Sequence, residues 1–172
     1  ASIVRKSGAS AAGGGGSGRS GRGRVTKSKS DDTGGAGSAL EAELESDPEV
    51  FVAGIDVGAG GNVFGLTRGL QERFGLRVRD TPISESAIVG VGVGAAMAGM
   101  RPVVEIMYLD FLGVCLDQLL NQAAKLPFMT GGRAEMALTV RTQFGAGRSS
   151  GSQHSQSLEA LLAHVPGLTV LM

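Results

Sequence analysis

The sequence predicts an α/β protein with a parallel β-sheet covered by helices, and two observations support this fold class. From residue 39 onward, strand-like segments alternate with helix-like segments, which is typical of a parallel sheet joined by helical crossovers. Residues 102–107 form an apolar run interrupted only by Glu105, as expected for a strand covered on both faces. About 134 residues follow residue 38, which is enough for one domain.

The first elements can be justified residue by residue. A short helix is expected at 39–45, and it should end before Pro48 because the residue preceding a proline avoids helical angles. A strand is expected at 50–53, followed by a glycine-rich turn at 54–61. A helix is then predicted at 63–74, because its apolar residues recur at the spacing of one helix face.

The second half of the domain repeats the alternation. Glycine and alanine dominate residues 87–100, so we expect a deeply buried helix whose neighbours pack close to its backbone. The sequence stops directly after the last predicted strand, so we expect an incomplete domain. The remaining elements are a strand at 76–79, a strand at 102–107, a helix at 111–124, a strand at 138–141, a polar loop at 142–153, a helix at 157–164 and a strand at 168–171.

Residues 1–38 differ in composition from the rest of the chain. The net charge of zero arises because residues 1–38 carry seven basic and two acidic residues, whereas residues 39–172 carry nine basic and fourteen acidic ones. Eleven glycines and no aromatic residue lie in the first segment, which predicts a disordered Gly/Ser/Arg-rich leader. A solvated linker, a nucleic-acid-binding tail and an organelle transit peptide remain open, although stacking on bases would need aromatic residues.

Other classes of protein are disfavoured by what the sequence lacks. The longest uncharged stretch, 86–100, has 15 residues, whereas a membrane-spanning helix needs roughly 20. The single Cys115 lies in an apolar run and is expected to be a small buried hydrophobe in an intracellular protein. The sequence shows neither the spacing of a metal site nor the GxSxG turn of a hydrolase.

Three segments carry candidate chemistry. The loop 54–61 could cradle phosphate or form only a tight turn, and it lacks both the GxGxxG spacing and a Walker lysine. Glu85 follows a strand end and precedes an apolar helix, where it could be a buried acid–base group, or Ser84 could simply cap the helix with Glu85 in its first turn. His154, in a polar loop before a helix, could be a general acid–base or merely exposed.

Several motifs together make a family recognisable. In order along the chain they are DTPISE at 80–85, AAMAGMRPVVE at 95–105, DQ at 117–118, AAK at 123–125, GG at 131–132, QHSQS at 153–157 and PGL at 166–168. The chain resembles the beta subunit of the thiamine-diphosphate-dependent dehydrogenase component of 2-oxo acid dehydrogenase complexes, of the pyruvate, branched-chain 2-oxo acid or acetoin type. The resemblance covers about residues 40–172.

This resemblance implies a three-layer, transketolase-like pyrimidine-binding domain at 39–172, truncated at its carboxyl terminus. It implies an oxidoreductase subunit that binds the aminopyrimidine end of thiamine diphosphate, while an alpha subunit holds the diphosphate and Mg2+. The expected partners are that alpha subunit, in an alpha2beta2 heterotetramer, and a lipoyl-bearing acyltransferase, with no nucleic acid or membrane. The expected location is cytoplasmic, or the mitochondrial matrix or a plastid if residues 1–38 are a transit peptide.

The resemblance also assigns site residues. Glu85 matches the glutamate that hydrogen-bonds the pyrimidine ring nitrogen, and His154 matches a histidine that assists acyl transfer. Both are therefore expected to be catalytic. The cofactor-binding positions that the motifs imply, with no metal ligand among them, are Ile83, Ser84, Glu85, Met107 and Phe111.

Two departures from the family pattern limit this expectation. Ile55 stands where the family usually has a glutamate in Gly-Glu-Asp-Val, so cofactor ordering is expected to be weaker. Family beta subunits are also about twice as long, so the chain alone is expected to be inactive, and a non-catalytic interaction remnant is an alternative. A place with transketolase or deoxyxylulose-phosphate synthase is a further reading, which the segment 153–157 disfavours.

Overall fold

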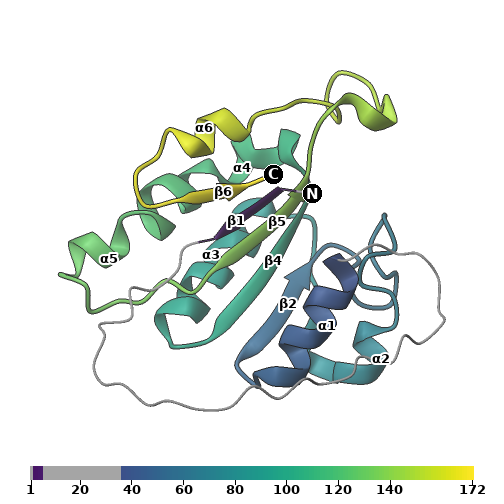
Figure 1. The fold of residues 1–172 in the computed structure, drawn as a ribbon, viewed down its shortest axis with the longest axis horizontal. Helices are drawn as coiled ribbons and strands as arrows, with labels where there is room; N and C mark the ends of the chain where they lie inside the picture. Colours follow the sequence, from purple (N-terminus) through teal and green to yellow (C-terminus); the bar gives the residue numbers. More distant parts are fainter. Residues whose placement is uncertain (1, 6–35) are drawn as a thin grey trace, which may run out of the picture.

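The structure is a computed structural model that describes residues 2–5 and 36–172. In these residues one six-stranded sheet has the strand order β3-β2-β4-β5-β1-β6, with helices on both sides (Figure 1). The strands are β1 (Ser2–Arg5), β2 (Val50–Gly54), β3 (Val78–Asp80), β4 (Arg101–Tyr108), β5 (Thr139–Gln143) and β6 (Thr169–Leu171). The helices are α1 (Ala36–Ser46), α2 (Leu70–Phe74), α3 (Glu85–Met97), α4 (Leu112–Asp117), α5 (Leu126–Met129) and α6 (Glu159–Ala163).

Four neighbouring strands, β3, β2, β4 and β5, run parallel, which confirms the predicted fold class. β2 pairs with β3 on one side and with β4 on the other, and β5 continues the sheet beside β4. The carboxyl ends of all four strands therefore meet at one edge. The chain passes from β2 to β3 and then crosses to β4 on the opposite side, so the strand order reverses at β2, and ligands of open α/β sheets bind at such a point.

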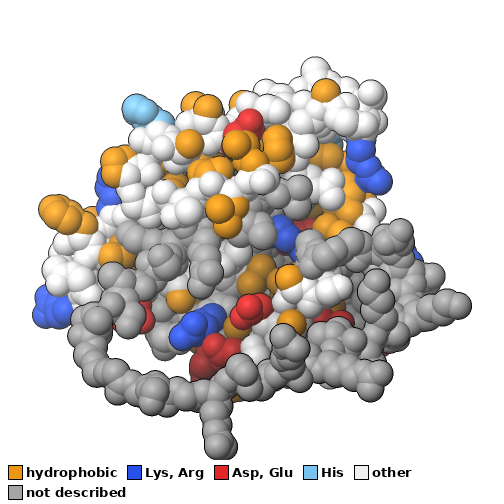
Figure 2. Space-filling model, viewed as in Figure 1, with side chains coloured by type: hydrophobic (Ala, Val, Ile, Leu, Met, Phe, Trp, Pro, Cys, Tyr) orange, Lys and Arg blue, Asp and Glu red, His pale blue; other side chains and the backbone are white. Residues whose placement is uncertain are grey.

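Apolar side chains cover both faces of the sheet, as the three-layer prediction requires. Neighbouring residues of β4 point to opposite faces: Val103 packs against the core cluster formed with α1 and α2, whereas Val104 belongs to the cluster formed with α3, α4 and α6. Figure 1 shows α1 in front of the sheet and α3 behind it. In the same view, Figure 2 shows hydrophobic side chains on the surface over α6 and β6. Cys115 is buried in the second of these clusters, which confirms its predicted role as a small hydrophobe.

The helix predicted at 63–74 is wrong over most of its length. Only α2 is helical, and residues 63–69 form turns and a bend. Gly65 and Gly69 have φ angles of 72° and 80°, a left-handed backbone that a helix cannot continue through. Of the apolar residues behind the prediction, Leu70 in α2 is buried, whereas Val63 in the turns is 57% exposed.

The prediction for residues 87–100 is partly confirmed. Helix α3 packs closely on one face, since a Cβ atom added at Gly92 would lie 2.9 Å from side-chain atoms of Leu138 and Val104. Its opposite face is open, however, and Val91 is 61% exposed. The expectation of deep burial is therefore wrong for the chain by itself. The helix also ends at Met97, before Gly99, whose φ of 91° stops it.

The remaining helical segments differ from expectation only in detail. The helix predicted at 111–124 is present as a short turn at Leu109–Phe111, α4 and a π-helical segment at Gln118–Ala123. Helix α5 was not predicted. Its Pro127 lies in the first turn, where a helix accepts proline. No helix of the described residues combines the length and the apolar character needed to cross a membrane.

The amino-terminal segment differs from the sequence prediction at both of its ends. Ser2–Arg5 forms β1, which pairs antiparallel with β5 and with β6, and α1 begins at Ala36. The β-branched residues Ile3 and Val4 suit a strand, and β1 supplies backbone partners to two strands that are not paired with each other. Residues 6–35, where the rest of the predicted leader falls, lie outside the described part.

Candidate functional site

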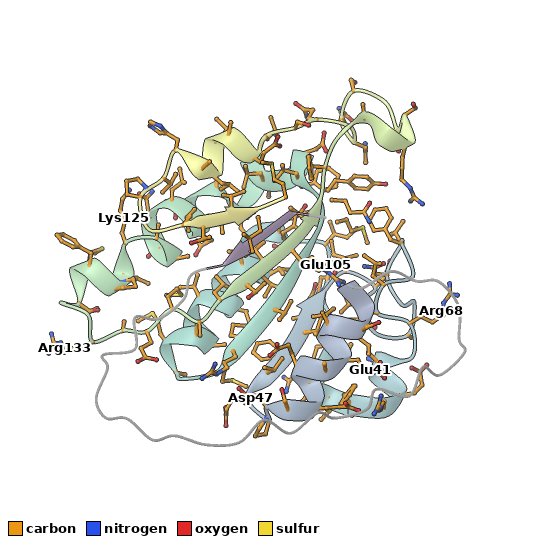
Figure 3. All side chains as sticks on the ribbon, viewed as in Figure 1. Glu41, Asp47, Arg68, Glu105, Lys125 and Arg133 are labelled. Carbon is orange, nitrogen blue, oxygen red and sulfur yellow. The ribbon has the colours of Figure 1, made fainter. Side chains whose placement is uncertain are left out.

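The loops that follow β2, β3, β4 and β5 all lie at the carboxyl edge of the sheet. The residues that sequence reasoning selected belong to three of these loops: Ile83, Ser84 and Glu85 follow β3, Phe111 follows β4, and His154 follows β5. Met107 lies in β4 itself. Figure 3 shows the labelled Glu105 near the same end of β4. The parallel topology therefore gathers the predicted residues at one edge.

Glu85 is the first residue of α3 and is buried, with 8% of its surface exposed. The segment before it is tied to the sheet, because the Thr81 amide donates to the Gly54 carbonyl at 3.0 Å. Among the residues that the structure describes, the Glu85 carboxylate accepts no hydrogen bond and forms no ion pair. Ser84 occupies the N-cap position and Glu85 lies in the first turn, as the structural reading of this pair expects, but the Ser84 side chain makes no capping hydrogen bond.

Besides burial, the negative charge of Glu85 raises the pKa of Cys115. Burial, and secondly the negative charge of Glu85, raise the pKa of the Cys115 thiol to about 11. The Cys115 Sγ donates to the Leu112 carbonyl at 3.6 Å, so the thiol lies against the first turn of α4. The Ser86 hydroxyl, one residue after Glu85, donates to the Val114 carbonyl, so the first turn of α3 lies against α4, the helix that begins directly after Phe111.

His154 belongs to a group of rings that we call the aromatic cluster, formed by Phe64, Tyr108, Phe111 and His154. The His154 ring centroid lies 4.8 Å from that of Tyr108 and 5.3 Å from that of Phe111, and both pairs meet edge to face. Phe64 packs on Tyr108 at 5.4 Å. The structure thus brings together two residues predicted independently, Phe111 and His154.

Two further contacts hold the aromatic cluster. Asp110 Oδ1 accepts hydrogen bonds from the backbone amide of Gln156 at 3.1 Å and from its Nε2 at 2.9 Å, which ties the His154 loop to the end of β4. The Arg148 guanidinium lies 5.1 Å from the centroid of the Phe64 ring, a cation–π distance. The imidazole is consequently half-buried and held from several sides.

The other predicted cofactor positions have mixed surroundings. Met107 and Phe111 are partly buried and pack against the core. Ser84 is exposed, and Ile83 is 80% exposed, so it offers an apolar surface beside Glu85. No contact between Glu85 and His154 is found in the described part of the chain.

The glycine-rich loop 54–61 behaves as a tight turn. Asp80 Oδ1 accepts a hydrogen bond from the Gly58 amide at 2.6 Å, and Asp80 Oδ2 accepts one from the Ala59 amide at 3.4 Å. A Cβ atom at Gly58 would lie 2.6 Å from the Asp80 carboxylate, which explains the glycine. Because a carboxylate already occupies these amides, the phosphate-cradle reading is not supported. Ile55, at the start of the loop, is buried in the core.

Sequence reasoning missed a buried polar network at the same edge. Glu105 accepts hydrogen bonds from Asn62 and from Arg141, and all three side chains are buried. Glu105 was seen only as an interruption of an apolar run, yet a lone carboxylate in such a run is the signal that a buried partner must exist. Among the described residues, no three His, Cys, Asp or Glu side chains are grouped as metal ligands would be.

Comparison with known proteins identifies the family. Residues 29–172 match the family described as the transketolase pyrimidine binding domain, and the match begins ten residues before the predicted boundary at 39. The beta subunit of acetoin:2,6-dichlorophenolindophenol oxidoreductase from Cupriavidus necator is 48% identical over 143 residues, which are 77% of this chain and 42% of that protein. The 2-oxoisovalerate dehydrogenase subunit beta of Bacillus subtilis is 46% identical over 135 residues, covering 78% of this chain and 41% of that protein.

A third relative is the pyruvate dehydrogenase E1 component subunit beta of Staphylococcus epidermidis, 44% identical over 135 residues, which are 78% of this chain and 42% of that protein. The chain therefore spans about two fifths of the length of these relatives. The family match covers most of the chain, and the parallel α/β sheet is the architecture that the resemblance implied. This chain belongs to the transketolase pyrimidine-binding domain family.

Proposed function

We propose that this chain is the pyrimidine-binding part of the beta subunit of a thiamine-diphosphate-dependent 2-oxo acid dehydrogenase, an oxidoreductase that works with an alpha subunit. The observation that carries the proposal is Glu85 at the carboxyl edge of the sheet. Only 8% of its surface is exposed, and its carboxylate accepts no hydrogen bond from the described residues, yet neither oxygen is among their buried atoms without a partner, so the carboxylate can be reached from outside. The relatives, which are beta subunits of acetoin, 2-oxoisovalerate and pyruvate enzymes, support the same reading.

The residues at this edge fit the aminopyrimidine end of the cofactor. A buried carboxylate is stabilised by a donor, and a protonated ring nitrogen is a donor of the right kind. Glu85 would accept that hydrogen bond, and the partly buried Phe111 and Met107 would give the ring an apolar surface to lie against. When bound, thiamine diphosphate supplies the electron sink for decarboxylation.

His154 has the second catalytic role in this proposal. Its imidazole is half-buried within the aromatic cluster and lies at the same edge as Glu85. It would donate or accept a proton, or hydrogen-bond the reacting group, during the acyl-transfer stage. Tyr108 and Phe111 restrict the orientation of the imidazole, which favours a single direction of proton transfer.

A partner surface lies beside the proposed site. Large exposed apolar residues occur before α3 (Ile83), in α3 (Val91) and in α4 (Val114), and exposed apolar residues on neighbouring elements mark contact surfaces. We assign this surface to assembly with the alpha subunit, which would also hold the diphosphate and Mg2+ in an alpha2beta2 heterotetramer. A lipoyl-bearing acyltransferase would receive the acyl group, and no nucleic acid or membrane takes part. A cytoplasmic location is proposed, and an organelle is the alternative if residues 1–38 are a transit peptide.

Two alternatives have support of their own. The 48% identity with an acetoin-oxidoreductase beta subunit favours acetoin as a substrate as much as a 2-oxo acid. Ile55, buried in the core where the family usually has a glutamate, favours a remnant that keeps the interaction surface without catalysis.

Cofactor binding tests the proposal and separates these alternatives. The full chain, mixed with a cognate alpha subunit, should bind thiamine diphosphate in calorimetry. Glu85→Gln should weaken binding at least about tenfold, since hydrogen bonds to charged groups contribute roughly 1.5–3 kcal/mol. The matched control is Glu135→Gln, which changes an exposed carboxylate and should bind as the wild type does. Equal binding by the Glu85 variant would refute the assigned role, and no binding by the wild-type complex would favour the remnant.

A further inference from the structure

Three buried polar side chains meet at β4: Asn62 comes from the loop after β2, Glu105 from β4 itself and Arg141 from the neighbouring β5. Asn62, Glu105 and Arg141 are 5%, 3% and 3% exposed. Arg141 donates to Glu105 Oε2 through Nε at 2.7 Å and also through Nη2, and Asn62 Nδ2 donates to Glu105 Oε1. Both carboxylate oxygens therefore have partners, one of them a cation and the other an amide.

The far end of the Asn62 amide organises the turn that follows it. Asn62 Oδ1 accepts hydrogen bonds from the backbone amides of Phe64 at 2.7 Å and Leu66 at 3.4 Å. The Asn62 backbone has a φ of 57°, in the left-handed region that asparagine tolerates better than most residues. Only a side chain with a donor at one end and an acceptor at the other can make both sets of contacts, because Glu105 accepts whereas the turn donates.

The backbone turn after Asn62 orients the aromatic cluster. Phe64 lies two residues after Asn62, and its ring meets Tyr108 at 5.4 Å with an interplanar angle of 76°. Tyr108 meets His154 at 4.8 Å with an angle of 83°. Edge-to-face pairs at these separations are favourable, so a shift of Phe64 would be passed to Tyr108 and then to the imidazole.

We propose that Asn62 is a positioning residue, which the buried Glu105 carboxylate orients so that the turn after it sets the aromatic cluster around His154. Capping a turn does not need a buried charge, since an exposed asparagine side chain can bond backbone amides equally well. The network instead makes the direction of the Asn62 amide depend on a carboxylate that Arg141 holds. The catalytic consequence rests on the proposed function, but the positional coupling depends only on contacts within this chain.

The sequence provides two site-specific reporters for a test on the full chain. It contains one tyrosine and no tryptophan, so the aromatic circular dichroism of tyrosine reports on Tyr108 alone. It contains two histidines, so an NMR spectrum of the imidazole Cε1–H groups should show His154, shifted by neighbouring rings, and the exposed His164 as an internal reference. Neither reporter needs cofactor or alpha subunit, so failure of the proposed function would leave this test unaffected.

Asn62→Asp is the decisive variant. It keeps an oxygen that accepts from the backbone amides of the turn, but it places a carboxylate oxygen, in place of the Nδ2 donor, against the Glu105 carboxylate. The His154 signal should move most of the way to that of an exposed histidine, and the tyrosine band should lose about half of its intensity, while His164 and the backbone spectrum stay unchanged. Exchanging donor and acceptor in Asn62→Asp with Glu105→Gln should move the His154 signal back. A folded Asn62→Asp variant with wild-type Tyr108 and His154 signals would overturn the proposal.

A matched control tests whether the effect is specific to Asn62, and a second variant is used if Asn62→Asp does not fold. Asn121→Asp changes an amide that donates to Asp117 Oδ1 at 2.7 Å on an exposed helix face, and it should leave both reporters unchanged. If Asn62→Asp does not fold, Asn62→Gly replaces it, since glycine accepts the same left-handed backbone without strain. The same displacement of His154 is expected from it, and an unmoved His154 signal would again overturn the proposal.

Discussion

Arg141→Met removes the cation that pairs with the buried Glu105, and this substitution should be among the most destabilising in the chain. The side chains of Arg141 and Glu105 are each 4% exposed, whereas those of the surface pair Arg73 and Glu41 are 50% and 42% exposed. Breaking a buried pair by removing one partner costs about 3–5 kcal/mol, because a charge is left buried without compensation. An exposed pair contributes about 0–1 kcal/mol.

Urea unfolding of the full chain, followed by backbone circular dichroism, measures this cost. A slope of about 1–3 kcal/mol per M of urea for a small domain implies that Arg141→Met lowers the midpoint by at least about 1 M. Arg73→Met is the matched control, the same change at an exposed ion pair, and it should lower the free energy of unfolding by less than about 1 kcal/mol. Because typical domains are stable by about 5–15 kcal/mol, the Arg141 variant should still be partly folded without urea.

A double variant separates loss of charge pairing from loss of packing. Glu105→Gln added to Arg141→Met removes the uncompensated charge but keeps an acceptor for Asn62. The double variant should therefore be more stable than Arg141→Met alone by at least about 1 kcal/mol. The reasoning would be refuted if Arg141→Met were no more destabilising than Arg73→Met, or if adding Glu105→Gln made it worse by the full cost of a second independent loss.

Three further predictions concern positions outside this pair. Gly92→Ala should lower the free energy of unfolding by about 1–3 kcal/mol, because the added Cβ meets tightly packed side chains. Gly94→Ala adds a Cβ that meets nothing within 4 Å and should raise the free energy of unfolding by about 0.4–1 kcal/mol. Equal urea midpoints for the two variants would contradict this prediction. The pKa of Cys115 is raised from its ordinary 9.0 to about 11, so the protonated thiol contributes stability below pH 9, and this contribution is lost as the pH rises toward 11. A Cys115→Ala variant should not show this loss of stability. Thiol reagents should react only slowly with the native wild-type protein at pH 8. Ile55→Glu should lower the melting temperature of the isolated chain, because it buries a carboxylate in the core. In the complex with the alpha subunit, the same variant should strengthen thiamine diphosphate binding. Unchanged affinity and turnover in that complex would contradict the cofactor-side role of this position.

Local sequence patterns predicted the order and type of most elements. They failed where the backbone conformation of single residues, rather than the apolar spacing, set where a helix begins or ends. Strands β2, β4 and β5 are found where short apolar segments predicted them. The helix predicted from residue 63 is absent until Leu70, because Gly65 and Gly69 adopt left-handed angles that apolar spacing does not reveal. Helix α3 was expected to be deeply buried, but its small residues allow close packing on one face, and Val91 is 61% exposed.

The candidate site divides in the same way. Glu85, Phe111 and His154 could be selected because motifs and strand ends are local in sequence, and the structure brings the last two into ring contact. Glu105 was visible only as an anomaly in an apolar run. Its partners could not be named, because Asn62 lies 43 residues before it and Arg141 lies 36 residues after it.

By itself the sequence determined the alternation of strands and helices, the parallel sheet that follows from it, the family and the residues that carry its motifs. These depend on side-chain periodicity, on turn residues and on short motifs, all of which act over a few neighbouring positions. The tertiary structure alone decided which buried polar groups meet, that Asp80 rather than a phosphate holds the glycine-rich loop, and that Glu85 is buried without a donor. These depend on strand order and register, which set long-range neighbours and which no local pattern encodes.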